Sequence, residues 1–191
     1  REGLVSADSE FLAFCAETDY PLSVIPPVAF RKPAAPAACM RIEGRAMDYE
    51  AVGAAYTWIC ENSDVVIVEG IGGALVPITA TETILDLAVE FDLPTVIAAR
   101  PYLGTINHSL LTLKAVRDAG LPAAGIVING YNAAEATLDQ ETAPGIIASF
   151  GHTSILSVVP FDEDSSVEEG RLGTAVLETL DLFDWEALCR T

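Results

Sequence analysis

A carboxylate followed by a glycine-rich turn stands at Glu69-Gly70-Ile71-Gly72-Gly73. It comes directly after residues 64–68, a short β-branched apolar run that is typical of a strand buried on both faces of a parallel sheet. In open α/β sheets, ligands bind outside the carboxyl ends of the strands. A carboxylate there can hold a metal ion, and glycines let a polyanion approach the backbone. The alternative is a buried strand that ends in a flexible turn with a solvated Glu69, and the spacing leaves both interpretations open.

A second group of polar residues follows the predicted strand at 94–99. Gly104 and Thr105 precede a helical pattern at 106–119, so they stand where the amides of a helix N-terminus attract an anion. The simpler alternative is that Thr105 or Asn107 only caps the helix. His108, in the first turn, is more typical of a surface or interface residue than of a catalyst.

Two more predicted strands end in polar or ring-flanking residues. The run at 123–128 is followed by Asn129-Gly130, and an asparagine amide has the donors and the acceptor that suit a base edge. Asn-Gly is also an ordinary turn pair. The run at 155–159 is followed by Pro160, Phe161 and Asp162, which could flank a planar ring or simply turn. Because a parallel sheet brings its strand ends to one rim, the four ends together indicate a site.

Strands alternate with helices along most of the chain. Helices are expected at 7–17, 48–61, 83–91, 106–119, 133–150 and 177–189, with a break at Pro144-Gly145 and a single turn at 37–41. Five prolines between residues 20 and 36 predict an extended connection there. This order indicates βαβ units and a parallel sheet covered on both faces. We therefore expect one three-layer α/β domain over residues 1–191, with its N-terminal strand or strands missing.

Composition narrows the possible classes. A hydrophobic fraction of 51% with 20% charged residues is globular, and no apolar run reaches the length of a membrane span. A formal charge of −18 argues against nucleic acid and membrane partners and leaves a cytoplasmic location as the expectation. The four scattered cysteines, without a Cys-x-x-Cys pair, predict buried free thiols.

With these residues assembled, the chain resembles dethiobiotin synthetase, the ATP-dependent ligase that closes the ureido ring in biotin synthesis. The resemblance runs from about Asp8 to Asp162 and is most specific at residues 68–73 and 103–112. The segment 33–36, residues 125–129 and the pair 159–160 agree in order and spacing. The family usually has alanine where Ile71 stands, a change that leaves the role of the glycines intact.

The resemblance implies a phosphate-loop NTPase-like fold and a role for each matching residue. Asp8 and Glu69 correspond to acidic ligands of Mg²⁺ and the nucleotide phosphates. Residues lining the nucleotide would be Asp8, Glu69, Gly70, Ile71, Gly72, Asn129, Gly130, Pro160, Phe161 and Asp162. Gly104, Thr105, Ile106 and Asn107 would hold the carboxylate of diaminopelargonate, across the interface of a homodimer.

The implied reaction uses diaminopelargonate, CO₂ and ATP. One amine captures CO₂ as a carbamate, ATP phosphorylates the carbamate, and the second amine closes the cyclic urea and releases phosphate. This chemistry depends on positioning and charge neutralisation.

The sequence departs from the family in one respect. Residues 1–191 contain no glycine-rich loop ending in Gly-Lys-Thr, and Lys32 and Lys114 lie in no such loop. The family's phosphate loop and a substrate-contacting lysine lie upstream of the position that matches Asp8. We therefore expect no catalytic residue within this chain, an upstream segment of about 30–50 residues in the complete protein, and little activity from residues 1–191 alone.

Two other interpretations stay open at this point. One is a related nucleotide-binding module that senses or regulates without closing a ring. The other is a truncated pseudoenzyme that serves as a dimerisation partner. Binding of diaminopelargonate without ATP separates the first from an enzyme, and an in-frame phosphate loop in the upstream coding sequence separates the second.

Overall fold

The computed structural model describes residues 7–189 as two compact units. The first comprises the chain up to Ile84 together with Ser166–Arg171, and the second comprises Leu85–Ser165 and Leu172 onward. Each unit is described by itself. The assignment of residues 1–191 to a single domain stays a prediction.

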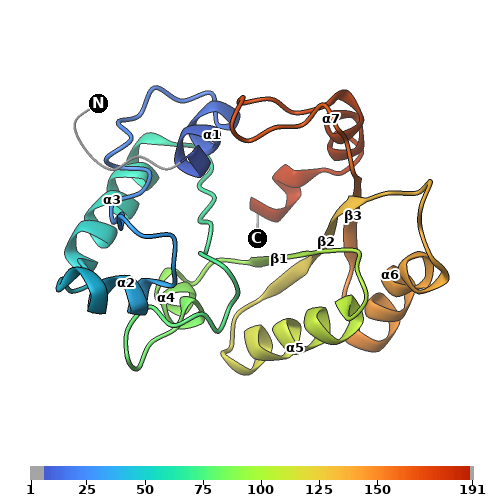
Figure 1. Ribbon diagram of the computed structural model, residues 1–191, viewed down its shortest axis with the longest axis horizontal. Helices are drawn as coiled ribbons and strands as arrows, with labels where there is room; N and C mark the ends of the chain where they lie inside the picture. Colours follow the sequence, from blue (N-terminus) through green and yellow to red (C-terminus); the bar gives the residue numbers. More distant parts are fainter. Residues whose placement is uncertain (1–6, 190–191) are drawn as a thin grey trace. The chain divides into compact units, whose positions relative to one another are not determined.

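The second unit contains a sheet of three parallel strands in the order β1-β2-β3 (Figure 1). The strands are β1 (Thr95–Ala99), β2 (Ala123–Tyr131) and β3 (Ile155–Pro160). Ile97 pairs with Ile126 in the first ladder, and Ile128 pairs with Val158 in the second. Each strand is a run of β-branched and small apolar residues, which suits pairing on both sides.

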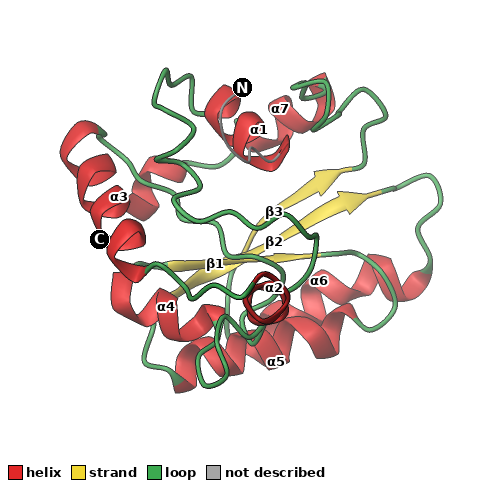
Figure 2. Cartoon of the chain, turned by 60° about the vertical axis from the view of Figure 1, so that its left-hand side comes forward, coloured by secondary structure: helices red, strands yellow, loops and turns green. Residues whose placement is uncertain are grey.

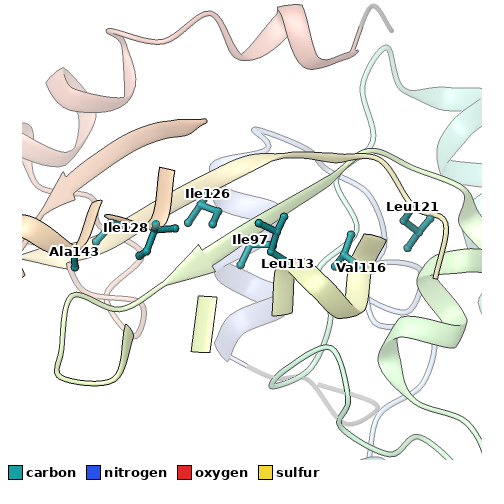
Figure 3. Close-up of a cluster of buried hydrophobic side chains, with 8 residues drawn as sticks. Ile97, Leu113, Val116, Leu121, Ile126, Ile128 and Ala143 are labelled. Carbon is teal, nitrogen blue, oxygen red and sulfur yellow. The ribbon is translucent and has the colours of Figure 1, made fainter. Parts of the chain in front are cut away.

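Helices cover both faces of this sheet. Helices α5 (Thr105–Asp118) and α6 (Leu138–Gly151) lie along one face, and α7 (Thr174–Leu180) lies on the opposite side (Figures 1 and 2). The core between the sheet and α5 and α6 consists of Ile97, Leu113, Val116, Leu121, Ile126, Ile128, Ala143 and Ile147 (Figure 3). Helix α4 (Ile84–Phe91) adds Leu85 and Ala88 to its edge. The predicted α/β class, a mostly parallel sheet with helices on both faces, is confirmed.

Arg117 ties two of these helices together. Its guanidinium donates to the carbonyl oxygens of Gly151 at 2.7 Å and His152 at 2.9 Å. Those carbonyls stand at the C-terminal end of α6, where His152 adopts a left-handed conformation with φ 47°. Carbonyls at a helix C-terminus lack intrahelical donors, so this side chain satisfies two of them from the neighbouring helix.

The first unit is largely helical. It contains α1 (Ala7–Cys15), α2 (Pro36–Glu43) and α3 (Tyr49–Asn62). Residues 18–35, between α1 and α2, contain no helix, as the prolines predict, but they form turns and bends and not the extended connection that was expected. The carboxylate of Asp48 caps α3 by accepting from the amide of Ala51 at 2.9 Å. A short apolar loop, residues 76–84, is closed by the bond from the Ile84 amide to the Val76 carbonyl at 3.0 Å.

The prediction of a strand at residues 64–68 is wrong. These residues form a bend and an irregular segment and belong to no strand among the described residues, and Ile67 is 87% exposed. A β-branched run indicates burial but supplies no partner, and a strand needs a neighbour for its ladder of hydrogen bonds. Only three of the four expected strands therefore form within residues 7–189.

Four smaller expectations also need correction. Pro144 stands inside α6 without breaking it, because Ala143 and Ile147 on either side of it are buried in the core. The helix begins at Leu138 and not at residue 133. A capping box formed by Thr137 and Gln140 starts it at that position. The last segment is two pieces, α7 and the 3-10 helix η1 (Trp185–Cys189). Asn129-Gly130 lies within β2, not in a turn after it.

The cysteines are free, as predicted, but three of the four are exposed. Cys39 is buried, and its thiol donates to the Lys32 carbonyl at 3.1 Å, whereas Cys15, Cys60 and Cys189 lie at the surface. Partial desolvation raises the pKa of the Cys15 thiol. No helix within residues 7–189 combines the length and the apolar character that crossing a membrane requires.

Candidate functional site

The carboxyl edge of the three-stranded sheet gathers the predicted residues of the second unit. Because β1, β2 and β3 are parallel, the residues that follow them emerge at the same edge. Residues 100–104 lead from β1 into α5, Asn129 lies near the end of β2, and Phe161 follows β3. The topology thus places these three predicted segments at one edge of one sheet.

Helix α5 begins in a form suited to an anion. Gly104 is its N-cap, with φ 94°, a left-handed conformation that favours glycine. The Thr105 amide donates to the Tyr102 carbonyl at 2.9 Å, and the amides of Ile106 and Asn107 have no backbone acceptor among the described residues. Amides in the first turn point outward along the helix axis and carry its partial positive charge.

Two buried hydroxyl groups on α5 lack hydrogen-bond partners in the described structure. They are Thr105 Oγ1 and Ser109 Oγ, on residues that are 7% and 2% exposed. Residues four apart lie on the same face of a helix, so the two hydroxyls are on one face of α5, in its first and second turns. A buried polar atom without a partner costs free energy, which a ligand group or a water molecule at this position would recover. Ser109 was missed from the sequence, although its spacing from Thr105 was a usable signal.

The imidazole of His108 lies against Gly104. A Cβ atom built at Gly104 would stand 3.3 Å from His108 Cε1, so both the ring and the backbone conformation restrict this position to glycine. The His108 amide donates to the Gly104 carbonyl at 3.0 Å. The ring therefore covers the N-cap and fixes the approach to the first turn of α5.

A β-bulge follows Asn129 near the end of β2. The register of β2 against β3 shifts between Asn129 and Tyr131, and Gly130 between them has φ 82°. Asn129 is exposed beside Val159 of β3, and the Phe161 amide donates to the Tyr131 carbonyl at 3.0 Å. An exposed amide and the half-exposed ring of Phe161 thus stand at the ends of neighbouring strands, where a planar group could contact both.

Asp162 directs its carboxylate to backbone amides. Oδ1 accepts from Asp164 at 2.9 Å, and Oδ2 accepts from Ala175 at 3.1 Å. Ala175 lies in the first turn of α7, so this side chain joins the end of β3 to a helix start 13 residues later.

The glycine-rich turn belongs to the first unit. Glu69 to Gly72 are exposed after the irregular segment 65–68. A Cβ atom at Gly70 would stand 2.6 Å from Ile84 Cγ2, and one at Gly72, where φ is 75°, would stand 2.9 Å from Val76 Cγ2. Both glycines are thus required for the turn to pack on the loop at 76–84, which holds Glu69 at its rim.

Asp8 lies in the first turn of α1 and is exposed, like Glu69. Within residues 7–189, no group of three or more His, Cys, Asp or Glu side chains is arranged to hold a metal. Mg²⁺ is commonly held by one or two carboxylates together with substrate phosphates and water. Asp8 and Glu69 carry the carboxylate oxygens that this ion prefers as ligands.

Comparison with known proteins places the chain among established relatives. A family model described as an AAA domain matches residues 2–169. A protein of Anaeromyxobacter sp. (strain K), named ATP-dependent dethiobiotin synthetase BioD, is 37% identical over 168 residues, which cover 88% of this chain and 75% of the relative. A protein of the same name from Bacillus licheniformis is 37% identical, with 84% of this chain and 68% of the relative covered.

A third relative of that name, from Thermodesulfovibrio yellowstonii, is 29% identical over 192 residues, which cover 97% of this chain and 78% of the relative. Identity at this level across most of each chain, together with the glycine-rich turn, the α5 start and the strand ends described above, shows that the chain belongs to the dethiobiotin synthetase family.

Proposed function

We propose that this protein is an ATP-dependent ligase of biotin biosynthesis that forms dethiobiotin from 7,8-diaminopelargonate and CO₂. The relatives that carry this activity in their names support the reaction class. The observation that carries the proposal is the start of α5. Outward amides, a glycine cap and two buried hydroxyls without partners suit a carboxylate, and diaminopelargonate has one.

Gly104, Thr105, Ile106 and Asn107 bind that carboxylate. Charge-assisted bonds from amides and a hydroxyl to an anion are short and about twice as strong as neutral ones. They fix one end of the substrate, so the two amines at the other end meet the reacting carbon in a set geometry. Holding reactants this way removes much of the entropic barrier to ring closure.

We assign two sets of residues, each within its own unit, to the parts of the nucleotide. Asn129 and Gly130, with residues 160–162, receive the adenine base, because the Asn129 side chain is exposed and Phe161 offers an exposed ring face. Asp8 and Glu69 to Gly72 face the phosphates. Two carboxylates alone repel phosphates, so Asp8 and Glu69 act there by holding Mg²⁺, which when bound neutralises phosphate charge during phosphoryl transfer.

The reaction then proceeds in three balanced steps. One amine attacks CO₂ and loses a proton, which gives a carbamate. A carbamate oxygen takes the γ-phosphoryl group of ATP and releases ADP. The second amine attacks the carbonyl carbon, forms the second C–N bond of the urea, loses a proton and releases phosphate. The protein acts as a cytoplasmic homodimer in which α5 of one subunit holds substrate for the other.

Residues 1–191 contain no phosphate loop, so we propose that the polypeptide of these residues alone has almost no activity. The test measures dethiobiotin and ADP produced from diaminopelargonate, bicarbonate and ATP. The protein expressed from its complete gene should form the two products in a 1:1 ratio, with dependence on Mg²⁺. ATP binding without any dethiobiotin would favour a regulatory module instead, and an ordinary enzyme rate from residues 1–191 would contradict the role given to the loop.

A further inference from the structure

The segment after β3 is closed by a set of polar contacts that the proposed reaction does not use. Both oxygens of the Asp162 carboxylate accept backbone amides, from Asp164 at 2.9 Å and from Ala175 at 3.1 Å. Ser165 adds two bonds: its amide donates to the Asp162 carbonyl at 3.1 Å, and its Oγ accepts from the Gly173 amide at 2.8 Å. We call Asp162, Ser165, Gly173 and Ala175 the β3–α7 clasp.

Gly173 is the position that lets the clasp close. A Cβ atom there would stand 2.1 Å from Asp162 Oδ2 and 2.2 Å from Asp162 Cγ, well inside any tolerated contact. Its φ of −70° is open to any residue, so the requirement for glycine comes from the carboxylate and not from the backbone. The close approach of Asp162 is therefore the reason that a residue without a side chain stands at this place.

The clasp acts on Phe161, the residue next to it. Phe161 is 56% exposed, so packing does little to hold its ring. Its backbone is held instead on one side by the bond from its amide to the Tyr131 carbonyl at 3.0 Å and on the other by Asp162. Val159, two residues earlier, pairs with Asn129. The clasp thus sets the position of the Phe161 ring relative to the Asn129 amide.

We propose that Asp162 is a positioning residue for nucleotide recognition: through the β3–α7 clasp it holds Pro160 and Phe161 as the wall that the base of the nucleotide meets. Its side chain acts through that wall, because each of its oxygens already accepts from a backbone amide of the clasp. This inference rests on the proposed function, since it assumes that the base binds beside Asn129 and Phe161.

The test replaces Asp162 with asparagine in the protein expressed from its complete gene. The amide nitrogen of asparagine cannot accept a hydrogen bond, so one of the two amide contacts is lost. The matched control is Glu163→Gln, which removes the same charge from an exposed neighbour. We expect the KM for ATP to rise about tenfold in Asp162→Asn, because a tenfold change corresponds to about 1.4 kcal/mol, close to the value of one hydrogen bond to a charged group. We expect kcat, the KM for diaminopelargonate and inhibition by inorganic tripolyphosphate to stay within twofold, because the phosphate and diamine sites are elsewhere.

A second variant, Gly173→Ala, tests the clasp from its other side. It should raise the KM for ATP similarly. In the double variant Asp162→Asn/Gly173→Ala the two effects should not add, since both disturb the same contact between Asp162 and the start of α7. Faster hydrogen exchange at the Ala175 amide in each variant would show the clasp opening.

The inference is overturned if Asp162→Asn leaves the KM for ATP unchanged. It is also overturned if the variant weakens the binding of ATP, tripolyphosphate and diaminopelargonate equally and lowers Tm at the same time. A parent protein without ATP-dependent ring closure would instead overturn the proposed function, and this inference with it.

Discussion

Replacing Thr105 with valine should make the protein more stable and a weaker binder of its substrate. Thr105 Oγ1 is buried without a partner, and burial of an unsatisfied hydroxyl costs about 1–3 kcal/mol. Valine keeps the shape of the side chain and has a similar helix propensity. We therefore expect the free energy of unfolding to rise by about 1–2 kcal/mol, which for a chain of this size raises Tm by roughly 2–8 °C.

The same change should weaken binding of diaminopelargonate. A hydrogen bond to a charged group is worth about 1.5–3 kcal/mol, so the Kd should rise roughly 10- to 150-fold. Calorimetric titration of the parent and the Thr105→Val variant measures this directly. Substrate should also offset the variant's gain in stability. At a concentration 100 times the parent Kd it adds about 2.7 kcal/mol to the parent but only about 0.9 kcal/mol to a variant that binds 30-fold more weakly.

Thr112→Val is the matched control on the same helix. Thr112 Oγ1 donates to the His108 carbonyl at 2.9 Å, so its hydroxyl is already satisfied. This variant should gain no stability and keep the parent affinity for diaminopelargonate. A Thr105→Val protein that is less stable than the parent and binds the diamine within twofold of the parent would refute the reasoning about the buried hydroxyl.

Two further predictions concern the packing that supports the site. Arg117→Ala should lower the free energy of unfolding, measured in urea, by about 1–3 kcal/mol, because two carbonyls at the end of α6 lose their donor. Arg117→Lys should restore little of this stability, because lysine lacks the planar fork of the guanidinium. A loss of under about 0.3 kcal/mol in Arg117→Ala would contradict this expectation. Gly70→Ala should cost about 1–3 kcal/mol and raise the KM for ATP, since its methyl group would meet Ile84 Cγ2. The loss of stability should be smaller in the double variant with Ile84→Ala. Gly73→Ala is the control and should have little effect, because nothing lies within 4 Å of its added Cβ. Equal losses of stability at Gly70 and Gly73 would contradict the role given to packing against Ile84.

The sequence was sufficient to place most of the secondary structure of the second unit. The strands at 95–99, 123–131 and 155–160 are apolar runs bounded by turn residues, and the helices between them carry one apolar face. The run at 64–68 has the same character yet forms no strand, because composition reports how apolar a segment is and not whether a neighbour can pair with it. Pro144 gave the opposite error, since the packing of Ala143 and Ile147 outweighs a local rule.

The parts of the candidate site that lie at strand ends or at glycines could be predicted from the sequence. The α5 start and the exposed Asn129 stand at the edge where parallel strands deliver their ligand-binding residues. The bulge at Gly130 could not be predicted, because it depends on register against β3. Nor could the β3–α7 clasp, since it joins Asp162 to Ala175 and needs Gly173 for reasons of space alone.

The most direct test of the account compares diaminopelargonate with its methyl ester as ligands of the protein expressed from its complete gene. The ester keeps both amines and the carbon chain but removes the negative charge that the α5 start is proposed to bind. Calorimetric titration should give a Kd for the ester roughly 10- to 150-fold higher than for the acid, and this difference should shrink in Thr105→Val. Equal affinity of the acid and the ester would contradict the central claim that the N-terminus of α5 holds the substrate carboxylate.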